Sequence, residues 1–367
     1  MTTAHAETAR KIVGYYYGKG RPHYQLSEVP VQKLTHLIYS HATPTAQGDC
    51  EMPHPDIDLP NLLSLKALRV QNPKLLVLLS VGGWSGSRYF SDIAATSAAR
   101  RHFSKSCMRI VEKYDLDGID IDWEYPVTGG KPTDHKRKSD KKNFVLLLKQ
   151  LRTDLNGLHH ERPTLLTIAS TAYRNHLNDL SVKEMAEVLD WFNVMGYDFD
   201  EMQRNRTFHH SGLFSWPTVA MANTDAIKFA NCDAAVQWYL DHGVPSEKIV
   251  LGLPFYGHIW ANVPAEQDGM FQPYKGSPSQ DGTLSYREIE QTYLPAYTRY
   301  WDNQAKVPWL YNKKTRIAIS YEDPESITAK AKYVIQKKLG GIMFWDLGQD
   351  DSKSTLLNAI DTGLAGE

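Results

Sequence analysis

A short acidic motif constrains this chain more than any other feature. Residues 117–124 read DGIDIDWE and place Asp120, Asp122 and Glu124 two positions apart in an otherwise apolar stretch. Alternate side chains of a β-strand share one face, about 6.6 Å apart, so the three carboxyl groups are predicted to point the same way. Crowded carboxylates cannot all stay ionised at neutral pH, and at least one should keep a proton, as a general acid does.

Two other interpretations of the acidic motif are a salt-bridged cluster and a metal site. Hard cations prefer many oxygen ligands from a flexible loop, whereas a buried strand offers few backbone carbonyls. The motif therefore favours acid–base chemistry, and neither a metal nor a cofactor is expected. Asp117 has the opposite parity to Asp120, which indicates a structural role for Asp117.

Short apolar runs alternate with helical patterns along the chain and predict eight strands, at 12–17, 34–40, 75–81, 118–124, 165–170, 191–197, 249–255 and 341–345. Alternating strands and helices imply parallel pairing through helical crossovers, and eight such units can close into a (β/α)8 barrel. The spacing alone leaves an open doubly wound sheet possible. The clearest helices are predicted at 97–114, 141–158 and 326–338, the last opened by Ser326 and ended by Gly340.

The alternating pattern breaks between residues 258 and 319, where Tyr, Gly, Pro and Asp are frequent. A structureless loop of that length is improbable in a compact enzyme. We therefore expect a small α+β insertion domain at 258–319, between strands seven and eight, and a barrel formed by 11–257 and 320–363.

The acidic motif and four further segments resemble one known family. Residues 117–126 (DGIDIDWEYP) are similar, position for position, to the DxxDxDxE signature of family 18 glycoside hydrolases, the chitinases. Other strands of that family are resembled by 80–84 (SVGGW), 195–198 (MGYD), 252–257 (GLPFYG) and 340–345 (GGIMFW). The resemblance runs from about Lys11 to Gly363 and is closest to bacterial chitinases with an inserted domain. It implies a closed (β/α)8 TIM barrel whose insertion walls the substrate groove.

The same resemblance implies a reaction and its catalytic residues. Chitinases of this family cleave β-1,4-linked N-acetylglucosamine polymers with retention, and the substrate's own acetamido oxygen is the nucleophile that forms an oxazolinium ion. Glu124 would protonate the glycosidic oxygen and then activate water, while Asp122 would orient the acetamido N–H. Asp120 would share a proton with Asp122. Tyr197 would hold the acetamido oxygen, and Asp198 would shape the electrostatics of the site.

Further positions are implied to bind substrate or to support the acids. Trp345 would form the floor under the distorted sugar and Trp84 a stacking surface further along the groove. Without the motif, Tyr197 and Trp84 would be interpreted as ordinary buried aromatics. The remaining positions of this kind are Tyr15, Ser80, Met195, Tyr256 and Tyr125.

The chain departs from the family pattern in two places. Many relatives have arginine after the Tyr-Gly of strand seven, where this chain has His258, and residues 199–202 (FDEM) replace a Trp-bearing loop. Subsite preferences therefore do not transfer. His209 and His210 suggest a metal site, but adjacent residues rarely converge on one ion, and they are interpreted as loop histidines.

Composition excludes several classes of partner. The net charge of −1 over 367 residues provides no global field toward nucleic acid, an anionic membrane or an acidic polymer, and an uncharged substrate fits. The basic stretch 131–142 contains Pro and Asp but no aromatics and is expected to be a solvated loop. Cys50, Cys107 and Cys232 are few, odd in number and far apart, so no disulfide framework is expected.

Residues 1–11 lack the apolar stretch of about 7–15 residues of a signal peptide, and no segment reaches the ~18 apolar residues of a membrane span. A removed leader, another export route and residence in the cytoplasm are all compatible with this. We expect a secreted monomer.

Two other functions would share the same acetamido-binding core. One is a catalytically silent chitin-binding lectin, although such relatives usually lose the acid that Glu124 retains. The other is an endo-β-N-acetylglucosaminidase acting on other acetamido glycans. The expected insertion and the aromatic residues favour a long linear chain as substrate, and therefore a chitinase.

Overall fold

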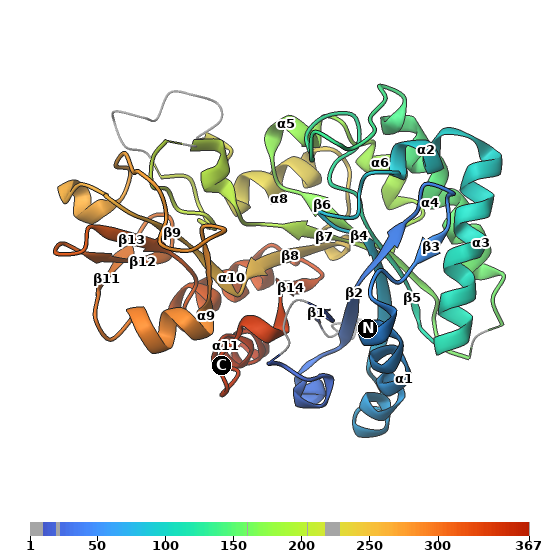
Figure 1. The fold of residues 1–367 in the computed structure, drawn as a ribbon, viewed down its shortest axis with the longest axis horizontal. Coiled ribbons are helices and arrows are strands. Elements are labelled where there is room, and N and C mark those ends of the chain that lie inside the picture. The colour runs from blue at the N-terminus through green and yellow to red at the C-terminus, as the bar shows by residue number, and fades with distance from the viewer. Residues whose placement is uncertain (1–9, 20–22, 160, 204, 217–227, 367) are drawn as a thin grey trace, which may run out of the picture.

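The computed structural model describes residues 10–19, 23–159, 161–203, 205–216 and 228–366 (Figure 1). Their main feature is a barrel of parallel strands. Its strands, in spatial order, are β1 (Lys11–Tyr17), β14 (Gly341–Trp345), β8 (Ile249–Pro254), β7 (Trp191–Met195), β6 (Leu165–Thr171), β5 (Gly118–Asp122), β4 (Leu76–Gly82) and β2 (His36–Pro44). Since β1 pairs with both β14 and β2, the sheet closes, and the predicted (β/α)8 barrel is confirmed.

Helices follow the strands and cover the outside of the barrel, with α2, α3 and α4 on the right of Figure 1. The helices are α1 (Pro55–Gln71), α2 (Phe90–Ala95), α3 (Ser97–Tyr114), α4 (Asp140–Asn156), α5 (Arg174–Leu177), α6 (Val182–Ala186), α8 (Cys232–Asp241), α9 (Tyr286–Glu288), α10 (Pro324–Gln336) and α11 (Thr355–Ala365). Short 3-10 or π turns are η1 (Leu26–Glu28), η2 (Val31–Lys33), η3 (Phe199–Gln203), η4 (Ser246–Lys248), η5 (Glu266–Gly269), η6 (Ile289–Tyr293) and η7 (Leu347–Gln349).

The three helices predicted from sequence are present, with small differences at their ends. α3 has the predicted bounds because Thr96 caps its first turn, accepting from the Ala99 N–H at 3.1 Å, and Asp115 ends it in a left-handed conformation. α10 begins earlier than expected, since Asp323 is its N-cap and Ser326 is the third helical residue of a capping box.

A second sheet lies beside the barrel, at the left of Figure 1. It is antiparallel, with the order β10 (Thr283–Ser285), β9 (Tyr256–Trp260), β13 (Ile317–Ser320), β12 (Val307–Asn312) and β11 (Thr298–Asp302). Because β9 begins one residue after Phe255, which follows β8, this sheet grows directly from a barrel strand. The boundaries 258–319 of a separate domain stay a prediction.

Three predicted strands have ends that are wrong by two residues or more, and the reasons are local. Leu34 is the cap of η2, so β2 begins at His36, and it runs on to Pro44 with a bulge between Tyr39 and Ala42. β5 ends at Asp122 because the backbone N–H of Glu124 donates to Ser87 Oγ at 2.9 Å instead of joining the ladder. β7 ends at Met195, so Tyr197 lies in the loop that follows.

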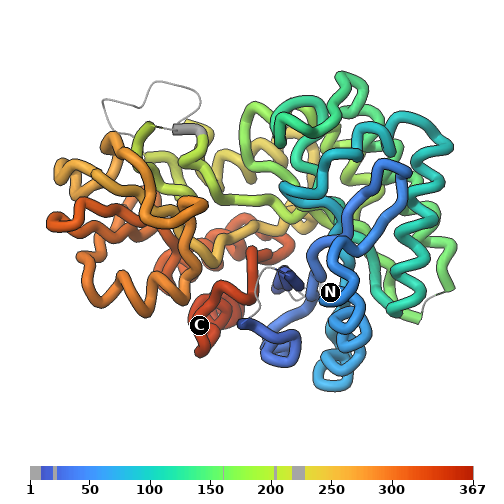
Figure 2. Tube along the Cα trace, viewed as in Figure 1, coloured from blue at the N-terminus to red at the C-terminus, as the bar shows by residue number. Residues whose placement is uncertain are grey.

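The inside of the barrel contains a layer of apolar side chains, and a layer of polar side chains lies next to it on the side of the carboxyl ends of the strands. Val13, Ile38, Leu78, Val250 and Met343 pack together inside the barrel, whereas the outward-facing Ile119 and Ile121 join the larger core under the helices. The chain winds once around this interior from β1 to β14 (Figure 2). The apolar layer therefore supports the polar residues near the carboxyl ends of the strands.

Asp117 has the structural role expected of it. Its carboxylate is buried and forms ion pairs with Arg69 at 2.6 Å and Arg162 at 2.5 Å, and it also accepts from the Val77 N–H. The three cysteines are buried and unpaired. Among the described helices, none has the length and apolar character needed to cross a membrane.

Candidate active site

Asp120 is the base of a buried polar cluster in the barrel. It is fully buried, and four side chains donate hydrogen bonds to it: Tyr15 (2.8 Å) and Ser80 (2.9 Å) to Oδ2, and Thr167 (2.6 Å) and Asn193 (3.2 Å) to Oδ1. Burial raises the pKa of Asp120 from its ordinary value, although these hydrogen bonds oppose the rise. The cluster holds Asp120 in one orientation.

Asp122 lies two residues further along β5, toward the carboxyl end of the barrel. Burial and the neighbouring charge of Asp120 raise the pKa of Asp122 well above its usual range. His41 Nε2 lies 3.3 Å from Asp122 Oδ2, and neither this nitrogen nor Asp122 Oδ1 has a hydrogen-bond partner among the described residues. Burial lowers the pKa of His41 to about 4, so His41 is neutral at pH 7.

Glu124 follows the end of β5 and is half-buried. Its pKa is raised well above the ordinary value, first by burial and then by the charge of Asp122. Ser87 anchors this turn, since Ser87 Oγ accepts from the Glu124 N–H and lies 3.0 Å from the Gly83 carbonyl, to which it can donate. Glu124 therefore binds a proton more tightly than an ordinary carboxyl group, and it lies at the mouth of the barrel, where barrel enzymes place their active sites.

Asp198 lies across the barrel mouth in a different electrostatic environment. Its Oδ1 accepts from the Tyr256 hydroxyl at 2.5 Å and lies 3.0 Å from His258 Nε2. Burial favours the neutral acid, but the nearby side chains of His258 and His210 outweigh burial and hold the pKa of Asp198 well below its usual range. Asp198 and Glu124 are thus acids with opposite pKa shifts, lowered for Asp198 and raised for Glu124.

His258 is held between two carboxylates. Its Nδ1 lies 2.6 Å from Asp200 Oδ2, while its Nε2 faces Asp198. Burial opposes its positive charge, but Asp200 and Asp198 outweigh burial and raise the pKa of His258 well above its ordinary value. The residue that replaces the arginine of many relatives is therefore also a cation.

An open cavity of about 410 Å³ connects these groups. Most of the residues predicted from sequence line it, namely Tyr15, Trp84, Asp122, Glu124, Tyr125, Met195, Tyr197, Asp198, Tyr256 and Trp345. Asp120 and Ser80 lie beneath it in the polar cluster. The roles assigned to these residues stay predictions, but the structure brings their side chains to one place.

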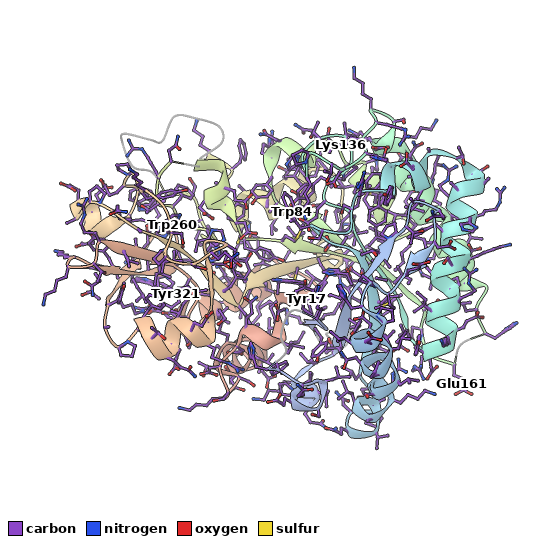
Figure 3. All side chains as sticks on the ribbon, viewed as in Figure 1. Tyr17, Trp84, Lys136, Glu161, Trp260 and Tyr321 are labelled. Atoms are coloured by element: carbon purple, nitrogen blue, oxygen red, sulfur yellow. The ribbon has the colours of Figure 1, made fainter. Side chains whose placement is uncertain are left out.

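A second cavity, of about 510 Å³, continues the first. The two share His41, Gly83, Trp84 and Trp345 in their linings, so they form one groove. The Trp345 ring is held by three neighbours, with ring-centre distances of 5.7 Å to Tyr15, 5.6 Å to Tyr17 and 5.4 Å to His41. Trp84 is 49% exposed, and Figure 3 places Trp84 and Tyr17 between the second sheet and the helices of the barrel.

Sequence reasoning missed several residues of the site. Thr167 pairs with Asp120 across β5 and β6, and Asn193 lies two residues beyond Trp191, the partner of Thr167 on β7, so strand parity could have found both. His41 and Tyr173 gave no such signal. His209 and His210 do lie in a loop, as predicted, but both are buried: His209 Nε2 lies 3.0 Å from Asp302, whereas His210 Nδ1 lies 3.8 Å from Asp198.

A closed parallel barrel with carboxyl groups and a groove near the carboxyl ends of its strands is the architecture of a barrel enzyme. Comparison with known proteins gives its family. The model described as "Glycosyl hydrolases family 18" matches residues 11–350. The chain is 35% identical over 419 residues to Chitinase A1 of Niallia circulans, an alignment that covers 99% of this chain and 59% of that protein.

Solved structures agree with this family. Chitinase ChiA74 from Bacillus thuringiensis superposes with a TM-score of 0.88 and 32% identity, covering 98% of this chain and 70% of that one. A family 18 N-acetylglucosaminidase from Paenibacillus barengoltzii has a TM-score of 0.83 and 33% identity, covering 96% of this chain and 99% of that one. The chain belongs to glycoside hydrolase family 18, and the predicted enzyme class is confirmed.

Proposed function

We propose that this protein is a chitinase that hydrolyses β-1,4-linked N-acetylglucosamine polymers by a retaining, substrate-assisted mechanism. The observation that carries the proposal is the set of three acids on β5 and just beyond its end. Asp120 is fixed by four hydrogen bonds, Asp122 lies above it, and Glu124, with a raised pKa, lies beside the open groove.

Glu124 protonates the glycosidic oxygen, and the bond from that oxygen to the anomeric carbon breaks. The carbonyl oxygen of the substrate's 2-acetamido group attacks the anomeric carbon from the other face and forms the cyclic oxazolinium ion. Glu124, now a carboxylate, takes a proton from water as the water opens this ring, which restores the acid and retains the configuration.

Asp122 accepts the acetamido N–H and stabilises the positive charge of the oxazolinium ion. Its raised pKa supports this role, because a proton shared with Asp120 lets the pair adjust its charge during the reaction. Tyr197 donates to the acetamido oxygen from the opposite wall. Asp198, kept ionised by His258 and His210, fixes the Tyr256 hydroxyl beside it.

The groove suits a linear sugar chain. Trp345 provides an apolar floor at the point where the two cavities meet, and Trp84 offers a half-exposed ring beside it. The second sheet stands on the side of Asp198 and Tyr256, and we assign to it the wall of the groove (Figure 1).

A second candidate function is release of single N-acetylglucosamine units. It is favoured by the similarity to the N-acetylglucosaminidase of Paenibacillus barengoltzii, which is covered almost completely. A silent lectin is less favoured, since Glu124 is present with a raised pKa. We also propose that the protein acts outside the cell, because a long polymer does not cross a membrane. We further propose that it acts as a monomer.

Hydrolysis of N-acetylglucosamine oligomers of four to six units tests the proposal, with product lengths and anomeric form measured early in the reaction. β-Anomeric dimers as main products support a chitinase. Monomers alone support the N-acetylglucosaminidase, and binding without cleavage supports the lectin. An α-anomeric first product contradicts the substrate-assisted mechanism.

A further inference from the structure

Three potential metal ligands, Asp198, His210 and His258, lie close together beside the second sheet. Asp198 follows β7, His258 lies on β9, and His210 lies in the loop between them. One ligand atom from each lies within 4.8 Å of the other two. Asp198 Oδ1 is 3.0 Å from His258 Nε2 and 3.8 Å from His210 Nδ1.

His210 is a buried imidazole without a hydrogen-bond partner. Its side chain has no exposed surface, and neither Nδ1 nor Nε2 forms a hydrogen bond within the described part of the chain. A buried polar group left unpaired is destabilising, and a bound ion would give it a partner. The backbone of His210 is fixed on both sides, since its N–H donates to Ser320 Oγ and its carbonyl accepts from the Phe199 N–H. The ring packs against those of Tyr256 and His258, with centres 5.5 and 4.8 Å away, and in this position its Nδ1 faces Asp198.

His258 has the orientation of a metal-binding histidine. Its Nδ1 faces the Asp200 carboxylate at 2.6 Å, which directs Nε2 toward Asp198. Histidines that bind metals usually donate their second ring N–H to a carboxylate in this way. The rings of His210 and His258 also stack, with centres 4.8 Å apart, so both lie on the same side of Asp198.

We propose that Asp198, His210 and His258 form a binding site for a divalent transition-metal ion, with Zn²⁺ as the best fit. Zinc binds His nitrogen at about 2.0–2.1 Å and carboxylate oxygen at about 2.0–2.2 Å, so tetrahedral ligand atoms lie about 3.3 Å apart. The two distances to Asp198 bracket this value. Two nitrogen ligands also favour zinc, nickel or copper over calcium or magnesium, which prefer oxygen.

The site is open on one side. Asp198 lines the substrate cavity and its side chain is 28% exposed, so an ion can enter from the groove and keep a water as its fourth ligand. The ion takes Asp198 Oδ1 away from the Tyr256 hydroxyl and replaces the proton on His258. If the proposed function holds, zinc therefore slows hydrolysis by altering Asp198 and Tyr256.

Calorimetric titration of the untagged protein with ZnCl₂, after chelator treatment, tests the site. We expect one zinc per chain, and at least a tenfold loss of affinity in His258→Gln and in His210→Gln. His135→Gln is the matched control, because His135 also contacts an aspartate, Asp92 at 2.5 Å, but lies on the surface. Unchanged binding in His258→Gln, or equal loss in His135→Gln, overturns the proposal.

Cobalt binding tests the wild-type protein without any substitution, so a variant that fails to fold does not decide the result. We expect one Co²⁺ with the intense visible absorption of a tetrahedral site, displaced by zinc. Only weak octahedral absorption, or no stoichiometric binding, contradicts the proposal. If the protein binds zinc but does not cleave chitin oligomers, the proposed function is refuted and the zinc site is supported. If it cleaves the oligomers but does not bind zinc, the zinc site is refuted and the proposed function is supported.

Discussion

The imidazole of His41 lies 3.3 Å from the carboxylate of Asp122, measured from Nε2 to Oδ2. The same ring stacks on Trp345, with an angle of 24° between the ring planes. His41 is thus the one described histidine that contacts both an acid of β5 and the aromatic floor. Because it is neutral, its Nε2 can carry a proton and donate to ionised Asp122 after a small rotation. We interpret His41 as a positioning residue.

His41→Phe is expected to lower kcat about tenfold while KM changes less. Phenylalanine keeps the stacking on Trp345, but the donor to Asp122 is lost, at a cost of about 1–1.5 kcal/mol. Since a hydrogen bond to the ionised form lowers a pKa, its loss should raise the pKa of Asp122 and move the acidic limb of the kcat–pH profile to higher pH. Steady-state kinetics on chitin tetramers across pH measure both effects.

His36→Phe is the control for His41→Phe. His36 is another buried histidine of β2, but it lies at the start of the strand against Trp191 and lines neither cavity. The kinetic constants and the pH profile of the His36→Phe variant should match those of the wild type under all conditions in which the variant is folded. An acidic limb that stays in place in His41→Phe would contradict the positioning role.

The closed barrel could be predicted because its strands are apolar runs separated by helical patterns, and the acids of β5 could be found because strand parity places them on one face. Parity also holds for Thr167 and Asn193. His41 could not be found in this way, because the bulge between Tyr39 and Ala42 breaks the alternation of β2 exactly where His41 lies. Only the folded chain shows which face that residue takes.

Glu124→Gln is expected to remove turnover while keeping oligosaccharide binding. The amide is nearly the same size as the acid but cannot transfer a proton, and general acid–base catalysis contributes about 10²–10⁴-fold. Since burial raises the pKa of Glu124, the wild-type acid should stay protonated well above pH 4.5, and activity should fall as pH rises through that raised pKa. Single-turnover assays and calorimetric binding of a chitin pentamer measure the two parts separately.

Glu161→Gln makes the same chemical change at an exposed position near the edge of the molecule, far from the groove (Figure 3), and should behave as wild type. Near-wild-type turnover in Glu124→Gln would refute the assignment of the acid. Loss of binding together with turnover would instead indicate a damaged fold, which circular dichroism can detect.

Trp84→Ala should weaken binding of long oligomers more than that of short ones. The ring is half exposed where the two cavities meet, so it can contact sugars of a chain that extends from one cavity into the other. An aromatic contact is worth about 0.5–1.5 kcal/mol, which predicts a rise in KM of roughly twofold to tenfold for hexamers. Trp301→Ala, on β11 and outside both cavities, is the control. Equal effects on trimers and hexamers would contradict this placement of Trp84.

The charge state of His258 was beyond sequence reasoning, because Asp198 and Asp200 reach it from a different part of the chain. The chain has this histidine where many relatives have arginine, and the sequence alone could not tell whether a positive charge was kept. The structure gives the reason that the positive charge is kept: the carboxylates of Asp200 and Asp198 contact the His258 ring at 2.6 and 3.0 Å.

This arrangement makes stability depend on pH in a defined direction. The pKa of His258 is raised in the folded protein, so its pairing stabilises the fold fully below the unfolded value of about 6.5 and is lost as pH rises through the raised value. The depressed pKa of Asp198 keeps that carboxylate ionised throughout this pH range. His258→Gln should therefore lower the free energy of unfolding by about 2–3 kcal/mol between pH 4.5 and 6.5, and by less as pH rises further.

Urea unfolding in chelator-containing buffers measures this difference. The control is His102→Gln, in an exposed pair with Asp49, which should change the free energy of unfolding by less than about 1 kcal/mol at any pH. A deficit in His258→Gln that grows from pH 6.5 to 9 would show that His258 is neutral in the folded protein.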